Sequence, residues 1–201
     1  MNNSRQSVVK RGMKRLCPAI FAVLTLLGFA APVAADTQRV TQRVKLDSGG
    51  TLHLESFAGR VTITGSDRSE VTIDAVRHGS RDLLDRVKLR ITSDSSSVRI
   101  EENKREHSWL DFGHVEAVET EFDLKVPRRV NLDITLFSAS LDVTGVEGSS
   151  HTVRTFSSRT MLDDVNGSIR VKSFSGPIEI RQTAWRGQPS LDVETFSGQI
   201  R

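Results

Sequence analysis

The segment between Glu101 and His114 carries residue types that could bind a metal ion. His107 and His114 flank Asp111, and imidazole and carboxylate groups are common ligands of zinc and related metals. The seven-residue separation of the two histidines matches no usual ligand spacing, and polar loops are rich in such residues. We therefore expect a polar loop and no metal site. Trp109 would be exposed in such a loop, and it is therefore the best single candidate for a contact with a partner.

A second group of candidates is acidic and lies in the C-terminal third. Its members could line one face of a sheet, as calcium sites and polysaccharide-cleaving sites do in some β-helices: Asp142, Asp163, Asp164, Asp192 and Glu194. Aspartates in turns, however, more often bond to the local backbone. A polysaccharide-active enzyme remains an alternative, and it requires Asp142, Asp163, Asp164 and Arg159 to converge in one groove.

No other motif predicts catalysis or a cofactor. The sequence has no Gly-x-Ser-x-Gly elbow and no phosphate-binding loop. Five cations alternate with apolar positions in the same region: Arg154, Arg159, Arg170, Lys172 and Arg181. This alternation predicts a solvated sheet face that discourages edge pairing. The more specific alternative is a face that binds an anionic glycan or a lipid headgroup. We predict that the chain is not an enzyme and has no catalytic, cofactor-binding or metal-binding residues.

These side chains belong to a repeated sequence motif, called the phrase below, and its strands must position them. A Phe, then small polar residues, then alternating aliphatic residues occur four times, beginning at Phe137, Phe156, Phe174 and Phe196. The intervals are 19, 18 and 22 residues. A similar phrase begins at Phe57. An apolar-x-Gly triplet keeps step with the phrase at residues 146–148, 165–167 and 185–187.

A period near twenty is typical of β-solenoids, in which successive coils stack about 4.8 Å apart. We expect an all-β, solenoid-like fold of stacked, β-helix-like coils with an inserted antiparallel hairpin region and little helix. The five phenylalanines would form one interior column, with Phe156 on the same side as Thr160 and Leu162. Trp185, at a repeat position, would also be core. An antiparallel meander with hairpins of similar length is the alternative.

The remaining segments predict strands, with one exception. Residues 82–86 have helical character, and apolar residues at 87–91 and 98–100 predict a hairpin. Residues 118–126 alternate strictly, with four apolar residues and Thr120 on one face and charged residues on the other, and Pro127 ends that strand. We expect one domain over residues 36–201, with ladder repeats at about 51–66 and 130–201 and an insertion at about 67–129.

The first 35 residues resemble a secretory signal peptide. They hold five basic residues, no acid, an apolar core from Ala19 to Ala31 and small residues before a predicted cleavage after Ala35. Met13 is an alternative start, and Cys17 lies at the beginning of the apolar core rather than at its end, where a lipid-anchored cysteine belongs. The sequence predicts a periplasmic, cell-surface or secreted protein.

The positive net charge belongs to this leader. The other 166 residues carry 23 basic and 25 acidic side chains, which removes the main electrostatic argument for nucleic-acid binding. They contain no cysteine and no second apolar run of about 18 residues, so we expect no disulfide and no membrane span in the mature chain.

The chain resembles a bacterial family of exported β-strand-repeat proteins described as adhesins or adhesin-like domains of unknown function. The resemblance rests on residues 54–65, 70–73 and 122–127 and on the phrases ending at 174–176 and 196–200. In that family the corner more often carries Asn, and the Gly is the steadier member, whereas Ala139 and Ser158 replace it here. The replacements predict that two corners lack a positive φ. The last phrase stops at Arg201, which predicts either a strand that forms the edge of the sheet or a longer protein.

The resemblance implies an all-β, solenoid-like fold at the cell envelope and no catalytic residues. We expect a non-enzymatic, adhesin-like interaction module whose partner is an envelope protein or a surface glycan. The alternative is a periplasmic sensing or assembly domain that acts with a membrane partner.

Overall fold

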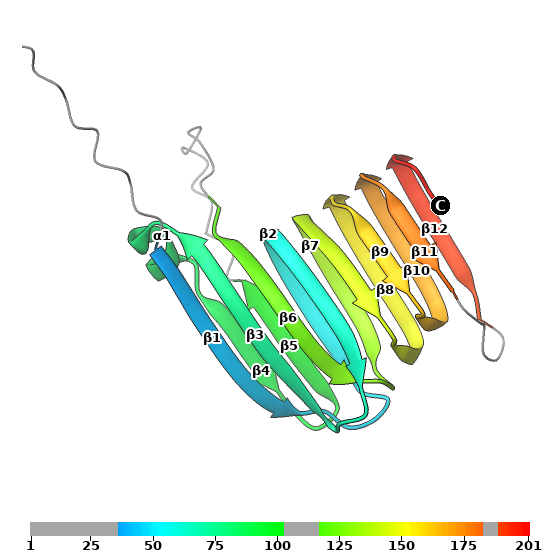
Figure 1. Ribbon diagram of the computed structural model, residues 1–201, viewed down its shortest axis with the longest axis horizontal. Coiled ribbons are helices and arrows are strands. Elements are labelled where there is room, and N and C mark those ends of the chain that lie inside the picture. The colour runs from blue at the N-terminus through cyan, green and yellow to red at the C-terminus, as the bar shows by residue number, and fades with distance from the viewer. Residues whose placement is uncertain (1–35, 103–116, 183–188) are drawn as a thin grey trace, which may run out of the picture. The chain divides into compact units, whose positions relative to one another are not determined.

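The computed structural model describes residues 36–102, 117–182 and 189–201, and this part of the chain is almost entirely β (Figure 1). The strands are β1 (Asp36–Lys45), β2 (Thr51–Ser66), β3 (Glu70–Gly79), β4 (Leu89–Ser93), β5 (Ser97–Glu102), β6 (Glu119–Pro127), β7 (Asn131–Thr144), β8 (Glu147–Ser157), β9 (Thr160–Asp163), β10 (Asn166–Ser175), β11 (Ile178–Arg181) and β12 (Leu191–Ser197). They form one mixed sheet with the main path β1-β3-β6-β2-β7-β8-β10-β12. The short helix α1 (Arg81–Arg86) follows β3.

The long strands β2 and β7 run side by side in parallel and organise the sheet. The first half of β2 pairs with β5 and the first half of β7, whereas its second half pairs with β6 and the second half of β7. On its other side, the first half of β7 pairs with β8 and the second half pairs with β9. Both strands therefore change partners at one corner, near Phe57 and Phe137, and the two halves lie in two layers (Figure 1).

The C-terminal strands repeat this arrangement in a matched parallel register. In one layer β7, β8, β10 and β12 follow one another, and in the other layer β7, β9 and β11 do so. Equivalent residues stand directly across from one another, as Ile134, Val153, Val171 and Val193 do. Because all of these pairs are parallel, the antiparallel meander considered as an alternative is wrong for the described residues 131–182 and 189–197.

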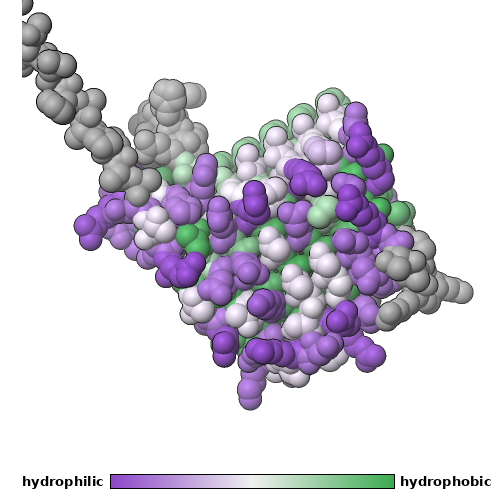
Figure 2. Space-filling model, in the orientation of Figure 1, coloured by the Kyte–Doolittle hydropathy of each residue, from purple (hydrophilic) through white to green (hydrophobic). Residues whose placement is uncertain are grey.

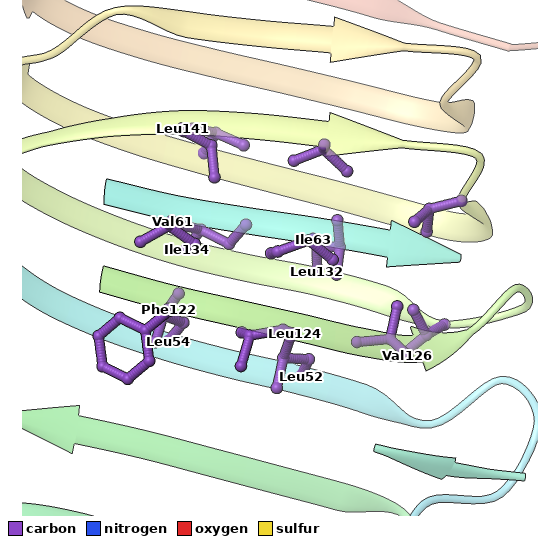
Figure 3. Close-up of a cluster of buried hydrophobic side chains, with 14 of the residues drawn as sticks. Leu52, Leu54, Val61, Ile63, Phe122, Leu124, Val126, Leu132, Ile134 and Leu141 are labelled. Carbon is purple, nitrogen blue, oxygen red and sulfur yellow. The ribbon is translucent and has the colours of Figure 1, made fainter. Parts of the chain in front are cut away.

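The hydrophobic core lies between the two layers. Leu52 and Leu54 on the first half of β2 are fully buried, as are Val61 and Ile63 on its second half. Figure 3 shows Val61 beside Ile134 and Leu54 beside Phe122, each pair coming from different strands of the core. Alternation with a period of two therefore buries one face of each strand and exposes the other.

The inserted segment supplies antiparallel strands. β3 lies between β1 and β6 and is antiparallel to both, and β4 pairs with β5 in a hairpin. The predicted hairpin, the helical turn at α1 and the strict alternation along β6 are confirmed. Ser80 caps α1 by accepting a hydrogen bond from the amide of Leu83, and Leu83 and Leu84 are buried in a cluster with Val118.

Glycine is required at corners where backbones approach closely. Gly176 has φ +115°, and a Cβ there would lie 2.1 Å from the carbonyl oxygen of Ser158. Gly59 has φ +118° and faces Thr120 in the same way. Ala139 and Ser158 occupy the matching corners without a positive φ, as their side chains predict.

Several sequence predictions lie outside the described residues: the signal peptide, Trp109 with its neighbouring histidines, and Trp185. In the part of the chain that the structure describes, no helix is both long and apolar enough to cross a membrane.

Candidate functional site: an exposed aromatic row

Five phenylalanine rings form one continuous row along the corner of the sheet. The centroids are 4.7 Å apart between Phe57 and Phe137, 4.8 Å between Phe137 and Phe156, 4.8 Å between Phe156 and Phe174, and 5.0 Å between Phe174 and Phe196. The interplanar angles are 9°, 1°, 4° and 10°, so neighbouring rings are nearly parallel and stacked. The row is about 19 Å long, and its spacing is that of neighbouring strands. Hydrophobic side chains follow this edge in Figure 2.

The rings lie on the outer side of the sheet. Phe156 alternates with the buried Thr155 and is 44% exposed, and Phe137 and Phe174 are 45% and 47% exposed. The prediction of an interior column is therefore wrong, as is the prediction that Phe156 shares a side with Thr160, which is fully buried. The corner between β8 and β9 interrupts the alternation, so the period of two does not continue from the ring to the next strand.

The stacking determines which part of each ring a partner can reach. The faces of the three middle rings are covered by their neighbours, so the row presents mainly ring edges. Phe196, 80% exposed, has a neighbour in the row on one side, at Phe174. Sugars that stack on aromatic residues need a free ring face, whereas apolar side chains can pack against ring edges. The row is thus better suited to an apolar surface than to a sugar ring.

Charged side chains stand beside the row on the same outer face. Asp133 Oδ1 accepts one hydrogen bond from Arg154 Nη1 at 2.8 Å, and Asp133 Oδ2 lies 3.2 Å from His53 Nδ1. Further along, Arg170 Nε lies 2.9 Å from Asp192 Oδ2, and the Lys172 and Glu194 side chains are 3.0 Å apart. These pairs follow from the register, because residues on adjacent strands that face outward are direct or diagonal neighbours.

The predicted cationic face is consequently balanced by carboxylates. Arg159 and Arg181 both contact Glu179, at 4.0 Å and 2.6 Å. Exposed pairs of this kind contribute about 0–1 kcal/mol each, so they define the pattern of the face more than its stability. Sequence analysis found the cations but not their partners. The available signal was the position of Asp133, four residues before Phe137, and of Asp192 and Glu194, four and two residues before Phe196.

The acidic candidates do not converge with Arg159. Asp142 faces Met161 across the strand pair, Asp163 faces Thr144, and no ion pair joins either aspartate to Arg159 among the described residues. Asp164 occupies a turn with φ +50°. The part of the chain that the structure describes contains no group of three or more His, Cys, Asp or Glu residues placed to hold a metal ion.

Two buried polar groups lie away from this face. His151 is 1% exposed; its Nε2 lies 2.9 Å from the carbonyl oxygen of Asn166, and Nδ1 has no partner. Burial lowers the pKa of His151, partly offset by the Asn166 carbonyl. Arg77 is 2% exposed, and its burial lowers the pKa of the guanidinium against the opposing effect of the Glu102 carboxylate.

Comparisons with known proteins give no family assignment. No family model matches the chain, and no curated protein matches it. A "putative cell adhesion protein" from Clostridium sporogenes has a similar structure, with 10% identity, 81% of this chain and 97% of that chain covered, and a TM-score of 0.46. A "putative adhesin" from Bacteroides fragilis (8% identity, 81% and 96% covered, TM-score 0.29) and a "putative lipid binding protein" from Parabacteroides distasonis (10%, 81% and 94%, 0.31) are also similar. Likeness at this level carries no argument about what the present chain binds.

Proposed function

We propose that this chain is a non-enzymatic binding module of the bacterial cell envelope, adhesin-like in its mode of action, which is exported and then contacts a partner through the aromatic row. In this proposal residues 51–66 and 130–201 form solenoid-like stacked units, and the units serve to hold identical side chains in straight rows. No step of bond making or breaking is involved.

The observation that carries the proposal is the exposure of an ordered apolar row on an otherwise charged face. Phe137, Phe156 and Phe174 each expose nearly half of their surface, although the strands offer buried positions one residue away. Contiguous apolar surface with a polar rim is typical of protein contact sites. Aromatic residues are also the side chains enriched in such sites.

The geometry favours a protein as the partner. A row of ring edges at intervals of about 4.8 Å matches the spacing of strands, so apolar side chains of a partner can pack between and along the rings. The ion pairs beside the row, such as Arg154 with Asp133, would supply a polar rim that fixes the orientation of the partner.

The test is loss of binding when the row is removed. The double variant Phe137→Thr/Phe156→Thr keeps β-propensity and removes two rings, and the matched control Thr135→Ala/Thr152→Ala changes the same face on the same two strands. Wild type and both variants are immobilised and exposed to solubilised envelope fractions and to a glycan array, with circular dichroism as the check of folding. We expect a partner that binds wild type and the control and is lost with the Phe variant.

The same experiment separates the two classes considered from the sequence. Retention of an integral membrane protein through the row supports the sensing or assembly role, and retention of an external surface protein supports the adhesin-like role. If the folded Phe variant binds every captured partner as wild type does, the row is not the contact surface and the proposal fails.

A further inference from the structure

A polar hollow lies at the other end of the strands from the aromatic row. Its volume is about 490 Å³, and it is lined by Ser48, Ser66, Asp67, Arg68, Ser69, Pro127, Arg128, Arg129 and Glu147. Phe57 lies in the middle of β2 and Ser66 at its end, so about 30 Å of extended strand separates the hollow from the row. Three turns meet here: β1 to β2, β2 to β3, and β6 to β7 (Figure 1).

Backbone hydrogen bonds tie these turns to one another. The Arg128 amide donates to the Ser66 carbonyl at 2.7 Å, and the Arg129 carbonyl accepts from Gly49 at the same distance. The Arg128 carbonyl accepts from the amide of Glu147 at 2.6 Å. The hollow is therefore framed by backbone that is held in place, which lowers the entropic cost of binding a ligand.

The arginines leave donors available in the hollow. Arg128 uses Nε for Asp67, at 3.2 Å, and no other hydrogen bond of its guanidinium is made to a described residue. Within the described ranges Arg129 has no ion pair or side-chain hydrogen bond. Guanidinium groups bind carboxylates through two parallel hydrogen bonds, so Arg128 and Arg129 offer a site for one anionic group.

The remaining lining groups suit hydroxyls rather than more negative charge. Asp67 and Glu147 bring two carboxylates to the same hollow, and Ser48 and Ser69 bring hydroxyls that can donate and accept. The carboxylates would repel a compact dianion such as phosphate, but Asp67 can accept hydrogen bonds from sugar hydroxyls. The combination matches a sugar residue that carries one carboxylate and several hydroxyl groups.

We propose that this hollow binds an acidic sugar residue of the uronic acid class, with its carboxylate on Arg128 and Arg129 and its hydroxyls on Asp67, Ser48 and Ser69. A volume of about 490 Å³ falls within the range of small-ligand sites. The site would take one or two sugar residues of an anionic polysaccharide. It is independent of the aromatic row.

The test uses the full chain and three probes: the disaccharide of galacturonic acid, the neutral disaccharide of galactose, and inorganic sulfate. Isothermal titration calorimetry is run on wild type, Arg129→Ala, Arg128→Ala and the control Arg90→Ala. Arg90 is exposed on β4, outside the hollow. We expect saturable binding of the acidic disaccharide, at least tenfold weaker in each hollow variant, unchanged in the control, and no binding of the neutral one.

Three results would overturn the assignment: no saturable binding of the acidic disaccharide, equal affinity in wild type and Arg129→Ala, or sulfate binding as tightly as the sugar, which would mean a plain anion site. Unchanged melting temperatures establish that a loss is local. The variant Phe137→Thr/Phe156→Thr should bind the acidic disaccharide as wild type does, so failure of the row and failure of the hollow are separate outcomes.

Discussion

The repeat strands and the inserted strands differ in their buried charges, because Arg77 and Glu102 are buried in the inserted strands and no acidic or basic residue other than His151 is buried among the described repeat strands. Between β7 and β12 the core includes rows in which aliphatic residues repeat, such as Ile134, Val153, Val171 and Val193, together with buried neutral polar residues. Near β3 and β5 the interior instead holds a polar cluster around Glu102, which accepts hydrogen bonds from Ser56, Thr120 and the amide of Phe57.

This difference shows two ways to fix the register of a sheet. A parallel row is specified by repetition, because a slip of one residue would expose every aliphatic side chain. The inserted strands lack the repeated sequence motif, although they alternate too, and a buried network that has only one satisfied arrangement can add to the specification of their positions. The first kind of specification is visible in the sequence, and the second is not.

The largest expected effect is at the polar cluster. Glu102→Ala removes the carboxylate that opposes the buried Arg77 and leaves its donors without an acceptor. We expect a loss of about 3–5 kcal/mol in the free energy of unfolding, measured by urea denaturation. The control Glu194→Ala removes an exposed carboxylate paired with Lys172 and should cost about 1 kcal/mol or less. Equal losses would mean that the cluster does not specify the inserted strands.

The close approach of backbones in the repeat region gives the next effect. Gly167 has φ +129°, and a Cβ there would lie 2.0 Å from the carbonyl oxygen of Gly148. Gly49 has φ +85° and nothing within 4 Å of such a Cβ. Gly49→Ala should cost only the backbone strain, about 1–2 kcal/mol, and Gly167→Ala clearly more, because neighbouring strands must also separate. Melting temperatures of the two variants measure the difference, and a larger loss at Gly49 would contradict it.

The aromatic row is expected to contribute less than an interior column would. An interior Phe→Ala change costs about 3–5 kcal/mol, but Phe174 is 47% exposed. We therefore expect about 2 kcal/mol for Phe174→Ala, which loses contact with two ring neighbours. Phe196→Ala, at 80% exposure and the end of the row, should cost less than about 1 kcal/mol. A loss above 3 kcal/mol at Phe174 would show that the row is mainly structural.

Particular residues show how far the sequence could lead. The alternation along β6, the hairpin of β4 and β5, and the common spacing of the phenylalanines are all patterns of local period, and the structure contains each of them. Which side of the sheet the rings occupy was not predictable, because the corner after Phe156 resets the alternation and its geometry depends on the neighbouring strand.

The ion pairs and the hollow were missed for a related reason. Asp133 and Arg154 are 21 residues apart, and the residues that line the hollow come from three turns and the start of β8. Their proximity depends on strand order, and the sequence did not reveal that β6 lies beside β2 in parallel. A different kind of signal can be read from the sequence alone: a residue whose type differs from that of the equivalent residues on neighbouring strands. His151 is such a residue.

His151 gives the smallest and most specific effect. It stands across from Leu132 and Ile169, in a row that is otherwise aliphatic. Because burial lowers its pKa below the ordinary value of 6.5, the folded protein binds fewer protons than the unfolded chain just below that pH. Stability should therefore fall as the pH drops below about 6.5, by at most about 1.4 kcal/mol per pH unit, until the lowered pKa is passed.

The variant His151→Leu restores the row and removes the titrating group. Its advantage over wild type in urea denaturation should grow between pH 7 and pH 5. A constant difference between His151→Leu and wild type over this range would mean that the folded protein accepts the proton without cost. In that case burial of His151 would carry no pH-dependent cost. The repeat strands would then resemble the inserted strands in this respect, because the buried charges of Arg77 and Glu102 oppose each other there.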